Sequence, residues 1–283
     1  MGNAPVSMSK LTRHPLYVLR GWLGSLGLFG KLSPPLLVFG SPNSGTRALA
    51  AALEVHPSLT DRSEARLLWD EHFHTKRNDT HKTAADARPR DRTRIRGNFR
   101  YYQWADRCPV VMNRHPENSV RVHFMKEIFP EAKLVHIVRD GHAAVCSNYT
   151  SAQRKESRKI HPFGGYIRPP GWREWLDRPL LEQLSFMWST STLYASREGA
   201  SYGDDFLEVK YEDLPGGAAT IIPRIWGMLG LESSDEVLER MPAFESRNYK
   251  WPETLTAAEV ETFERIARPA LEHFGYACVG TAT

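Results

Sequence analysis

Short apolar runs alternate along the chain with stretches of helical hydrophobic spacing. Four of the runs have the length of buried strands, at Leu36–Phe39, Val110–Met112, Lys133–Val138 and Phe206–Val209. Apolar residues recur at helical spacing over residues 46–55, 117–129, 180–194 and 221–229, and again after a capping box at Thr256–Glu259. Such alternation predicts a three-layer α/β fold in which helices flank a central parallel sheet.

The first 33 residues precede the first predicted strand and form an N-terminal arm, and residues 34–283 form one domain. Residues 16–40 are rich in Leu, Gly and Trp, but Arg20 and Lys31 interrupt them. The apolar run is therefore shorter than the ~20 residues that span a bilayer, and its glycines make a poor secretory signal. We expect residues 16–33 to pack against the domain or to make peripheral contact with a membrane.

Two polar segments lack a regular hydrophobic period, and both predict long mobile loops. Residues 70–107 contain six arginines between positions 88 and 100, and residues 151–173 combine basic residues with glycine and proline turns. These loops form either a solvated charged surface or the rim of a site for an acidic acceptor.

The composition is that of a folded protein, with 41% hydrophobic and 25% charged residues. It excludes a disordered or collagen-like chain. The three cysteines are too few for a disulfide framework or a four-ligand zinc site, and they indicate a reducing, cytoplasmic location. The net charge of +4 fits an anionic ligand but is too small to indicate a nucleic-acid partner.

The strongest local signal is a glycine-bounded turn between the first predicted strand and the helix after it. This turn reads Gly40-Ser41-Pro42-Asn43-Ser44-Gly45-Thr46-Arg47. In such a turn, backbone N–H groups and the positive end of the helix dipole converge on one point and create an anion site. The hydroxyls of Ser44 and Thr46 add donors, and Arg47 adds a charged fork.

The turn differs from an ATP-binding P-loop at one decisive position. Gly40 and Gly45 have the spacing of G-x-x-x-x-G-K-S/T, but Thr46 stands in place of the lysine that binds the β- and γ-phosphates. The predicted fold is therefore P-loop-like, and the missing lysine argues for a different phosphate-bearing nucleotide.

The same turn resembles the 5′-phosphosulfate loop of sulfotransferases, usually written G-x-P-R/K-S/T-G-T-T/R. These enzymes transfer a sulfuryl group from 3′-phosphoadenosine 5′-phosphosulfate (PAPS). Their second motif is a strand that ends in Arg-Asp, with a serine eight residues after the arginine, and it matches Arg139, Asp140 and Ser147. The resemblance implies that Arg139 and Ser147 bind the 3′-phosphate.

Further motifs extend the resemblance over roughly residues 36–276, with a layout similar to tyrosylprotein and bacterial sulfotransferases. Tyr211-Glu212-Asp213-Leu214 is similar to a late Y-E-D-L element, and Lys250-Trp251 is similar to a C-terminal closing segment. The residues that the resemblance assigns to the nucleotide are Gly40, Ser41, Asn43, Ser44, Gly45, Thr46, Arg47, Arg139, Ser147, Tyr211, Lys250 and Trp251.

Sulfuryl transfer requires a base for the acceptor and cations where negative charge develops. Glu64 has the spacing of the catalytic glutamate in tyrosylprotein sulfotransferases, while His115 occupies the region where cytosolic sulfotransferases have a catalytic histidine. Asn43 stands where the family has Arg or Lys, so Arg47 and Arg114 are the candidates to supply the missing charge. The resemblance implies no metal.

The sequence thus predicts a PAPS-dependent sulfotransferase, which acts on a hydroxyl or amine by in-line displacement with a carboxylate base. One alternative is a catalytically impaired protein that binds PAPS or its product 3′-phosphoadenosine 5′-phosphate (PAP), because Asn43 departs from the motif. Another is a P-loop phosphotransferase. The acceptor class stays open between a small molecule, a glycan, a lipid and a peptide tyrosine, and no pattern indicates an oligomeric state.

Overall fold

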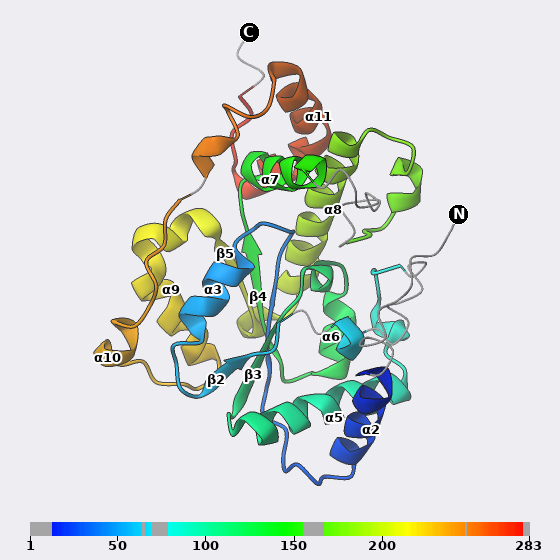
Figure 1. Ribbon diagram of the computed structural model, residues 1–283, viewed down its shortest axis with the longest axis vertical. Coiled ribbons are helices and arrows are strands. Elements are labelled where there is room, and N and C mark those ends of the chain that lie inside the picture. The colour runs from blue at the N-terminus through cyan, green and yellow to red at the C-terminus, as the bar shows by residue number, and fades with distance from the viewer. Residues whose placement is uncertain (1–12, 64–65, 70–78, 155–166, 247, 280–283) are drawn as a thin grey trace.

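A computed structural model describes residues 13–63, 66–69, 79–154, 167–246 and 248–279 of the chain (Figure 1). Five parallel strands form one sheet in the order β2-β3-β1-β4-β5. The strands are β1 (Leu36–Phe39), β2 (Leu59–Asp61), β3 (Val110–Arg114), β4 (Lys133–Val138) and β5 (Phe206–Lys210). The four predicted strands are confirmed. The short strand β2 was not predicted, because only the first of its three residues is buried.

Helices of widely different length connect and cover the strands. They are α2 (Arg13–Ser25), α3 (Thr46–Leu53), α4 (Arg66–Trp69), α5 (Pro89–Asp106), α6 (Val122–Ile128), α7 (Gly141–Arg154), α8 (Leu180–Ala200), α9 (Leu214–Met228), α10 (Asp235–Leu238) and α11 (Ala257–Phe274). Single 3-10 turns include η2 (Ala84–Asp86), η3 (Pro116–Val120), η5 (Trp172–Trp175), η6 (Gly203–Asp205), η7 (Tyr211–Asp213) and η8 (Asn248–Lys250). The predicted capping box at Thr256 and Glu259 begins α11.

Alternation along β1 divides the molecule into layers. Leu36 and Val38 pack on the face of the sheet that α3 and α9 cover. Leu37 and Phe39 point to the opposite face and pack against α5 and α6. Figure 1 shows α9 on one side of the sheet and α5 and α6 on the other. A third cluster joins α7, α8 and α11 beyond the carboxyl end of β4. The three-layer α/β architecture with a central parallel sheet is therefore confirmed.

The central position of β1 fixes where its following loop lies. In the parallel register, Val38 pairs with Arg114 of β3 on one side and with Val135 of β4 on the other. The chain passes from β1 to β2 on one side and later crosses to β4 on the opposite side. Ligands of open α/β sheets bind at such a reversal of strand order, at the carboxyl ends of the strands.

The segment 70–107 was predicted to be a loop, and this prediction is wrong for its second half. Residues 89–106 form α5, whose Ile95, Phe99 and Tyr102 are buried in the core. Arginines on the outer face are held by ion pairs, among them Arg96 with Glu131 at 2.7 Å. The many arginines between these residues made the helical spacing of the apolar core positions hard to recognise in the sequence. Residues 70–78 lie outside the described part of the chain.

The structure describes both ends of the second predicted loop, residues 151–173. Helix α7 extends to Arg154, and Ile167 is fully buried in the cluster formed with α8 and α11. Thr80 fixes the following residue, because its hydroxyl accepts a hydrogen bond of 2.7 Å from the Arg168 N–H. Residues 155–166 lie outside the described part.

The N-terminal helix α2 crosses α5 at very short distance. A Cβ atom on Gly24 would lie 2.3 Å from the carbonyl oxygen of Gly97, and one on Gly21 would lie 2.6 Å from that of Arg94. The Arg100 guanidinium donates to the Gly24 carbonyl at 3.0 Å. The small residues thus dock α2 on the domain. Across the described residues, we find no helix with the length and apolar character needed to cross a membrane.

Candidate active site

The turn between β1 and α3 is shaped by its two glycines. A Cβ on Gly40 would meet the Ile137 carbonyl oxygen at 2.2 Å, so the turn lies directly on β4. Gly45 has a φ of 98°, and a Cβ there would lie 2.4 Å from the ring of Tyr211. Both positions therefore need glycine, one for close packing and one also for its left-handed backbone.

The turn offers a set of hydrogen-bond donors at the start of α3. Thr46 is the first residue of the helix, and Arg47 after it is exposed. The hydroxyl oxygens of Ser41 and Ser44 are buried, and neither has a hydrogen-bond partner in the described part of the chain. Buried hydroxyls are normally paired. Together with the N-terminal N–H groups of α3, they fit a bound phosphate or sulfate ester.

Asn43 holds the turn in shape through both its backbone and its side chain. Its φ of 66° lies in the left-handed region, which asparagine tolerates better than most residues. Its amide donates to the Asn148 Oδ1 of α7 at 2.8 Å, and Asn148 in turn donates to the Pro42 carbonyl at 3.1 Å. The residue that departs from the family motif therefore serves as a structural link between the turn and α7.

Arg139 reaches this turn from the end of β4. Its side chain is buried, and its Nη1 donates to the Asn43 carbonyl at 2.9 Å. Its guanidinium carbon lies 4.6 Å from the ring centroid of Tyr211. Sequence motifs that are about 100 residues apart thus meet around one guanidinium.

The closing segment lies next to the same arginine, and Ser147 lies on α7 beside the turn. Ser147 precedes Asn148 on α7, in the part of the helix that contacts the turn. The Asn248 side chain of η8 accepts from Arg139 Nε at 2.8 Å. Lys250 is exposed, and the Trp251 ring stacks on the His142 ring with 4.5 Å between their centroids. The structure therefore brings the Lys-Trp segment to the strand end where Arg139 lies.

The carboxylate of Glu212 connects these elements. Glu212 accepts from the Asp140 N–H at 3.0 Å, from Asn248 Nδ2 at 2.6 Å and from the Tyr276 hydroxyl at 2.8 Å. Burial and the neighbouring Glu212 carboxylate raise the pKa of the Tyr276 hydroxyl, which therefore stays protonated as the donor. Glu212 thus fixes the end of β4, the closing segment and the C-terminal residues to one another.

His142 is a buried cation at the start of α7. Its Nδ1 lies 2.8 Å from the Asp140 carboxylate and its Nε2 lies 2.9 Å from the Glu264 carboxylate. Burial lowers the pKa of His142, but the hydrogen bonds and charges of Asp140 and Glu264 outweigh it and raise the pKa above its ordinary value. A ring with a carboxylate at each nitrogen is an imidazolium, and it carries Trp251 on its face.

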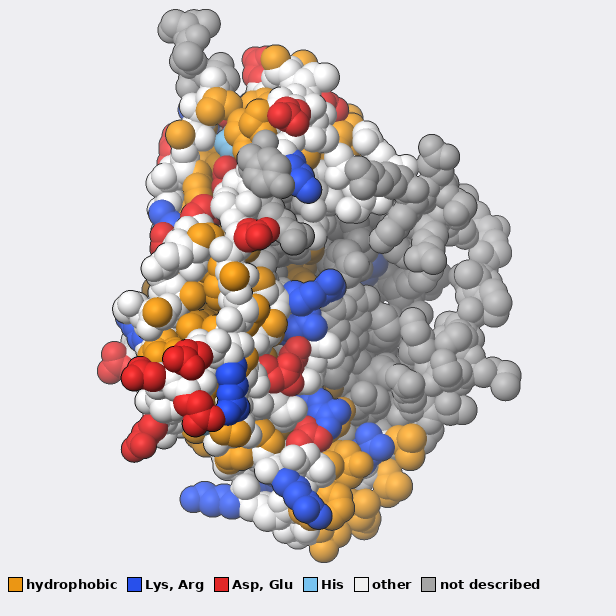
Figure 2. Space-filling view, turned by 60° about the vertical axis from the view of Figure 1, so that its left-hand side comes forward, with side chains coloured by type: hydrophobic (Ala, Val, Ile, Leu, Met, Phe, Trp, Pro, Cys, Tyr) orange, Lys and Arg blue, Asp and Glu red, His pale blue; other side chains and the backbone are white. Residues whose placement is uncertain are grey.

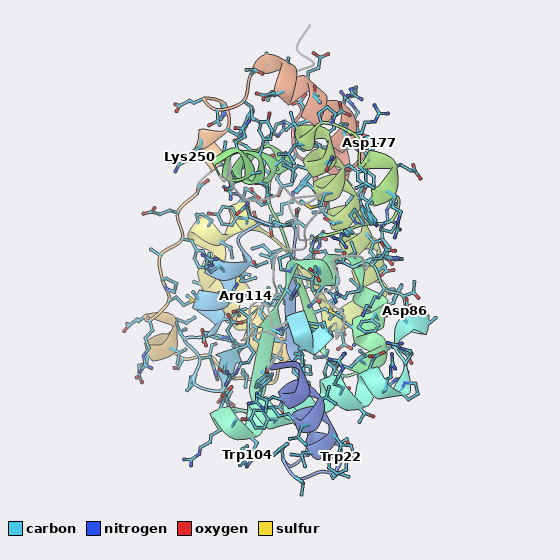
Figure 3. All side chains as sticks on the ribbon, turned by 45° about the vertical axis from the view of Figure 1, so that its right-hand side comes forward. Trp22, Asp86, Trp104, Arg114, Asp177 and Lys250 are labelled. Carbon is cyan, nitrogen blue, oxygen red and sulfur yellow. The ribbon has the colours of Figure 1, made fainter. Side chains whose placement is uncertain are left out.

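A second charged pair lies at the ends of β2 and β3. Arg114 Nε donates to Asp61 Oδ2 at 2.7 Å, and both side chains are partly buried. Figure 3 places Arg114 near the middle of the molecule and Lys250 above it. The pair orients the Arg114 guanidinium at the same edge of the sheet as the turn, since Arg114 is in register with Val38.

Of the two candidate bases, the structure describes His115 but not Glu64. His115 is fully buried, and its Nδ1 accepts a hydrogen bond of 3.2 Å from the Glu117 N–H. A backbone N–H can only donate, so the neutral ring carries its proton on Nε2. Glu64 follows β2 by three residues and lies outside the described residues.

A family profile described as "Sulfotransferase family" matches residues 34–236, which include the turn, the Arg139 motif and Tyr211. The chain belongs to the sulfotransferase family. The predicted family is thereby confirmed.

Curated sulfotransferases are related to parts of the chain. Omega-hydroxy-beta-dihydromenaquinone-9 sulfotransferase Stf3 of Mycobacterium tuberculosis is 29% identical over 150 residues, which cover 50% of this chain and 35% of that protein. Protein-tyrosine sulfotransferase A of Caenorhabditis elegans is 25% identical over 222 residues, which cover 74% of this chain and 53% of that protein. The chain spans about half or less of the length of these curated relatives.

Solved sulfotransferases share the fold. Sulfotransferase STF1 of Mycobacterium tuberculosis H37Rv superposes with a TM-score of 0.56 at 15% identity, covering 93% of this chain and 86% of that one. Sulfotransferase STF9 of Mycobacterium avium superposes with a TM-score of 0.55 at 15% identity, covering 95% and 81%. The predicted P-loop-like fold is therefore confirmed.

Sequence reasoning gave no role to several residues that hold the candidate site together. Asn148 directly follows the predicted Ser147, Glu212 directly follows Tyr211, and Asn248 lies two residues before Lys250. Each neighbours a motif residue and has a side chain able to hydrogen bond, which is the signal that could have found it. His142 lies three residues after Arg139, and no sequence pattern assigned it a role.

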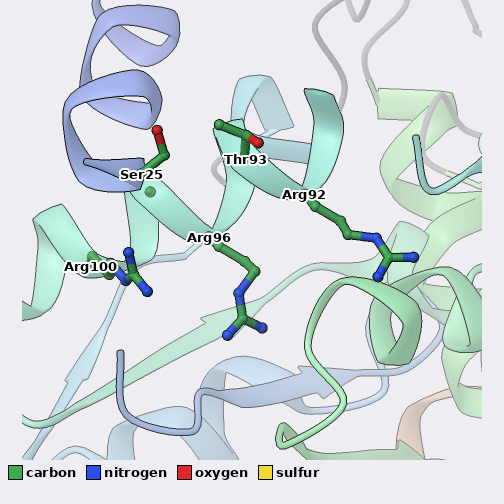
Figure 4. Close-up of a pocket in the computed structure, with 6 residues that line it drawn as sticks. Ser25, Arg92, Thr93, Arg96 and Arg100 are labelled. Carbon is green, nitrogen blue, oxygen red and sulfur yellow. The ribbon is translucent and has the colours of Figure 1, made fainter. Parts of the chain in front are cut away.

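One pocket in the structure lies elsewhere. It has a volume of about 190 Å³ and is lined by Ser25, Arg92, Thr93, Arg96, Gly97 and Arg100 of α2 and α5 (Figure 4). Arg92 pairs with Glu127, and Arg96 pairs with Glu131. These lining residues are not those of the strand ends where the sulfotransferase motifs meet. Within the described ranges, no three His, Cys, Asp or Glu side chains are grouped to hold a metal ion.

Proposed function

We propose that the protein transfers a sulfuryl group from PAPS to a hydroxyl or amine acceptor. The observation that carries the proposal is the bond between Arg139 and the carbonyl of Asn43. It joins the two nucleotide motifs of the family at one point, next to the buried hydroxyls of Ser41 and Ser44. A nucleotide with phosphate groups on both its 3′- and 5′-positions fits two anion sites held at a fixed separation.

In this proposal the turn from Gly40 to Arg47 binds the 5′-phosphosulfate through backbone N–H groups and hydroxyls. Arg139 and Ser147 bind the 3′-phosphate. The Tyr211 ring holds Arg139 in place by packing against the face of its guanidinium. The exposed Lys250 adds a cation next to Trp251, whose ring is held by His142. No residue in this set requires a metal.

The chemical step is an in-line displacement. A base takes the acceptor proton, the acceptor oxygen or nitrogen bonds to sulfur, and the bond from sulfur to the 5′-phosphate oxygen breaks to release PAP. We assign the base to Glu64, because the Nδ1 of His115 already accepts the Glu117 N–H. We assign Arg114 to the charge that develops in the transition state, since Asp61 orients its guanidinium.

The acceptor is proposed only by class. One curated relative is named for sulfation of a dihydromenaquinone, a lipid, and another for sulfation of protein tyrosine. Both names specify a hydroxyl-bearing acceptor. We propose a hydroxyl, or an amine, of a small molecule, glycan or lipid, or the hydroxyl of a peptide tyrosine. All three cysteines of the chain are free, which fits a reducing cytoplasmic compartment.

Asn43 favours a second candidate function, a protein that binds PAP or PAPS with impaired catalysis. Its amide bears no charge and is engaged with Asn148. The loss of one interaction that stabilises charge in the transition state raises the activation free energy by about 2.7–4 kcal/mol. A P-loop phosphotransferase has less support, because Thr46 replaces the lysine of that motif.

The experiment compares nucleotides by thermal unfolding and then by turnover. PAP should raise the melting temperature more than AMP, because a ligand that binds only the folded state stabilises it and AMP lacks the 3′-phosphate. Arg139→Ala should remove most of that difference, whereas Arg265→Ala, an exposed arginine on α11, should keep it. Equal shifts with PAP and AMP in the wild type would contradict the nucleotide assignment.

Turnover then separates the candidate functions. Radiolabelled sulfate should move from PAPS to hydroxyl acceptors in a cell extract, and no phosphate should move from ATP. Specific PAP binding without any labelled product would favour the impaired protein. Phosphate transfer from ATP would favour the phosphotransferase.

A further inference from the structure

Exposed apolar side chains gather on and beside α2. Seven of the nine large hydrophobic residues that are exposed in the described part belong to this region. We define the α2 patch by Leu16, Leu19, Trp22, Leu26, Leu28 and Trp104, which are between 47% and 63% exposed. Figure 2 shows hydrophobic side chains gathered at the lower end of the molecule, and Figure 3 places Trp22 and Trp104 there. Patches of this kind mark interaction sites.

The patch is held rigidly, although it faces solvent. The opposite face of α2 is pressed against α5 through Gly21 and Gly24. Trp104 lies in the last turn of α5. The centroid of its ring is 5.2 Å from the ring centroid of Phe29, which follows α2. The apolar face of α2 therefore faces outward on a fixed support, and the described residues of the domain leave it exposed.

The part of the N-terminal chain that forms the patch carries only positive charge. Residues 16–33, which include most of the patch, contain no Asp or Glu but two basic residues, Arg20 and Lys31. Lys31 is exposed next to the patch, and so is Arg107 immediately after α5. On the other flank, Glu127 and Glu131 neutralise Arg92 and Arg96, so the pocket there does not extend the positive rim.

Apolar and aromatic side chains beside cations are the composition of helices that lie in the interface of an anionic membrane. Tryptophan favours this interface because its ring is apolar and its N–H is polar. With 13 residues, α2 is about 20 Å long. The hydrocarbon core of a bilayer measures ~30 Å, so α2 fits along the surface.

A second copy of the chain fits the patch less well. In a two-fold symmetric contact the same surface meets itself. Lys31 and Arg107 of both copies would then be brought into one interface, which gathers four positive charges without an acidic partner from residues 16–33. An anionic lipid surface gains from the same cations.

We infer that the α2 patch docks the protein on the surface of anionic phospholipid membranes. The patch lies at the opposite end of the molecule from Lys250 in Figure 3, and it shares no residue with the nucleotide motifs. Docking therefore leaves the nucleotide site accessible, and the inference does not depend on the proposed reaction.

Sedimentation of the full chain with vesicles tests the inference. Vesicles of phosphatidylcholine with one third phosphatidylglycerol should bind the protein, and pure phosphatidylcholine should bind it much less. The Leu19→Ala/Leu26→Ala variant should lose binding about tenfold or more, because it removes apolar groups that enter the interface. The charge-reversed Lys31→Glu/Arg107→Glu variant should show a similar loss.

The matched control removes exposed apolar groups elsewhere. Leu176→Ala/Val279→Ala should bind within about twofold of the wild type, since both residues are exposed but lie outside the patch. Thermal unfolding of each variant checks that the fold is kept. Equal binding of patch and control variants would overturn the inference, as would no vesicle binding by the wild type. A dimer that Leu19→Ala/Leu26→Ala converts to a monomer would assign the patch to a second copy instead.

Discussion

Arg139 and Asn43 are 96 residues apart in the chain, and the guanidinium of the first donates to the carbonyl of the second at 2.9 Å. The contact joins the carboxyl ends of β4 and β1. These strands are paired in the sheet, and β1 is the central strand. It acts on the backbone of Asn43, so it does not depend on which side chain occupies that position. The side chain of Asn43 is instead bound to Asn148.

Asn43→Lys tests whether the missing charge of the family motif can simply be restored. We expect the substitution to destabilise the protein by about 1–2 kcal/mol, because lysine in the left-handed region is strained and the bond to Asn148 is lost. Turnover should not increase, since we assign the required charge to Arg114 and a second cation adds like-charge repulsion. Chemical denaturation and initial rates measure both effects.

Asn43→Gly is the matched control for that substitution. Glycine accepts a φ of 66° without strain and removes the same hydrogen bond, so its loss of stability should be smaller. A wild type without activity that gains turnover in Asn43→Lys would contradict this prediction and favour the impaired protein.

Gly45→Ala should disrupt the turn. The new Cβ would lie 2.4 Å from the Tyr211 ring in a backbone with φ 98°, so we expect a loss of about 2–4 kcal/mol in stability. The PAP-induced shift in melting temperature should also fall, because Tyr211 lies under Arg139.

Gly227→Ala in α9 serves as the comparison, since a Cβ there meets nothing within 4 Å and the residue is exposed in a helix. This variant should be neutral or more stable by about 0.5–1 kcal/mol. Similar stabilities for Gly45→Ala and Gly227→Ala would exclude the close contact with Tyr211.

Local sequence was sufficient for the phosphate turn and for the Arg139 motif. Both are a strand that runs directly into a turn and a helix, so spacing along a few residues specifies them. Helix α11 was also predicted from its capping box, because that motif needs only Thr256 and Glu259.

Contacts between distant elements could not be predicted in the same way. Glu212 binds Asn248 36 residues away, and His142 binds Glu264 122 residues away. No periodicity encodes such pairs, because they depend on how α7, α11 and η8 pack around β4. Helix α5 was missed for another reason: arginines separate its core residues, so composition concealed its period.

Stability should depend on pH through His142. Because its pKa is raised in the folded protein, its contribution is fully present below the unfolded value of about 6.5 and is lost as pH rises through the folded value. His142→Gln should therefore cost about 2–3 kcal/mol near pH 6 and clearly less near pH 9. Urea unfolding of both proteins across this range measures the difference.

Glu264→Gln should reproduce this trend, because it removes one of the two carboxylates that face the imidazolium. Glu272→Gln, on the exposed side of the same helix, should leave the pH dependence of the wild type unchanged. A loss that stays constant from pH 6 to pH 9 in His142→Gln would contradict the charged state of the ring.

The last prediction concerns the base. Glu64→Gln keeps the shape of the side chain and removes its proton-accepting charge. It should lower kcat by about 10²–10⁴-fold, the usual share of general-base catalysis, while the PAP-induced shift in melting temperature stays nearly unchanged. His115→Asn should reduce kcat much less, because the Nδ1 of His115 already accepts the Glu117 N–H and its neutral ring carries the proton on Nε2.

The acceptor decides whether this comparison is informative. An acidic phenol loses its proton readily and needs little help from a base, so both variants would remain active with it. An unactivated alcohol depends on the base, and the ranking of Glu64→Gln and His115→Asn should be measured there from initial rates and the pH dependence of kcat. Glu64→Gln should also remove the acidic limb of that pH profile, which a merely structural role would leave in place. The opposite ranking, with His115→Asn far slower, would assign proton abstraction to His115 and require its ring to leave the Glu117 N–H during turnover.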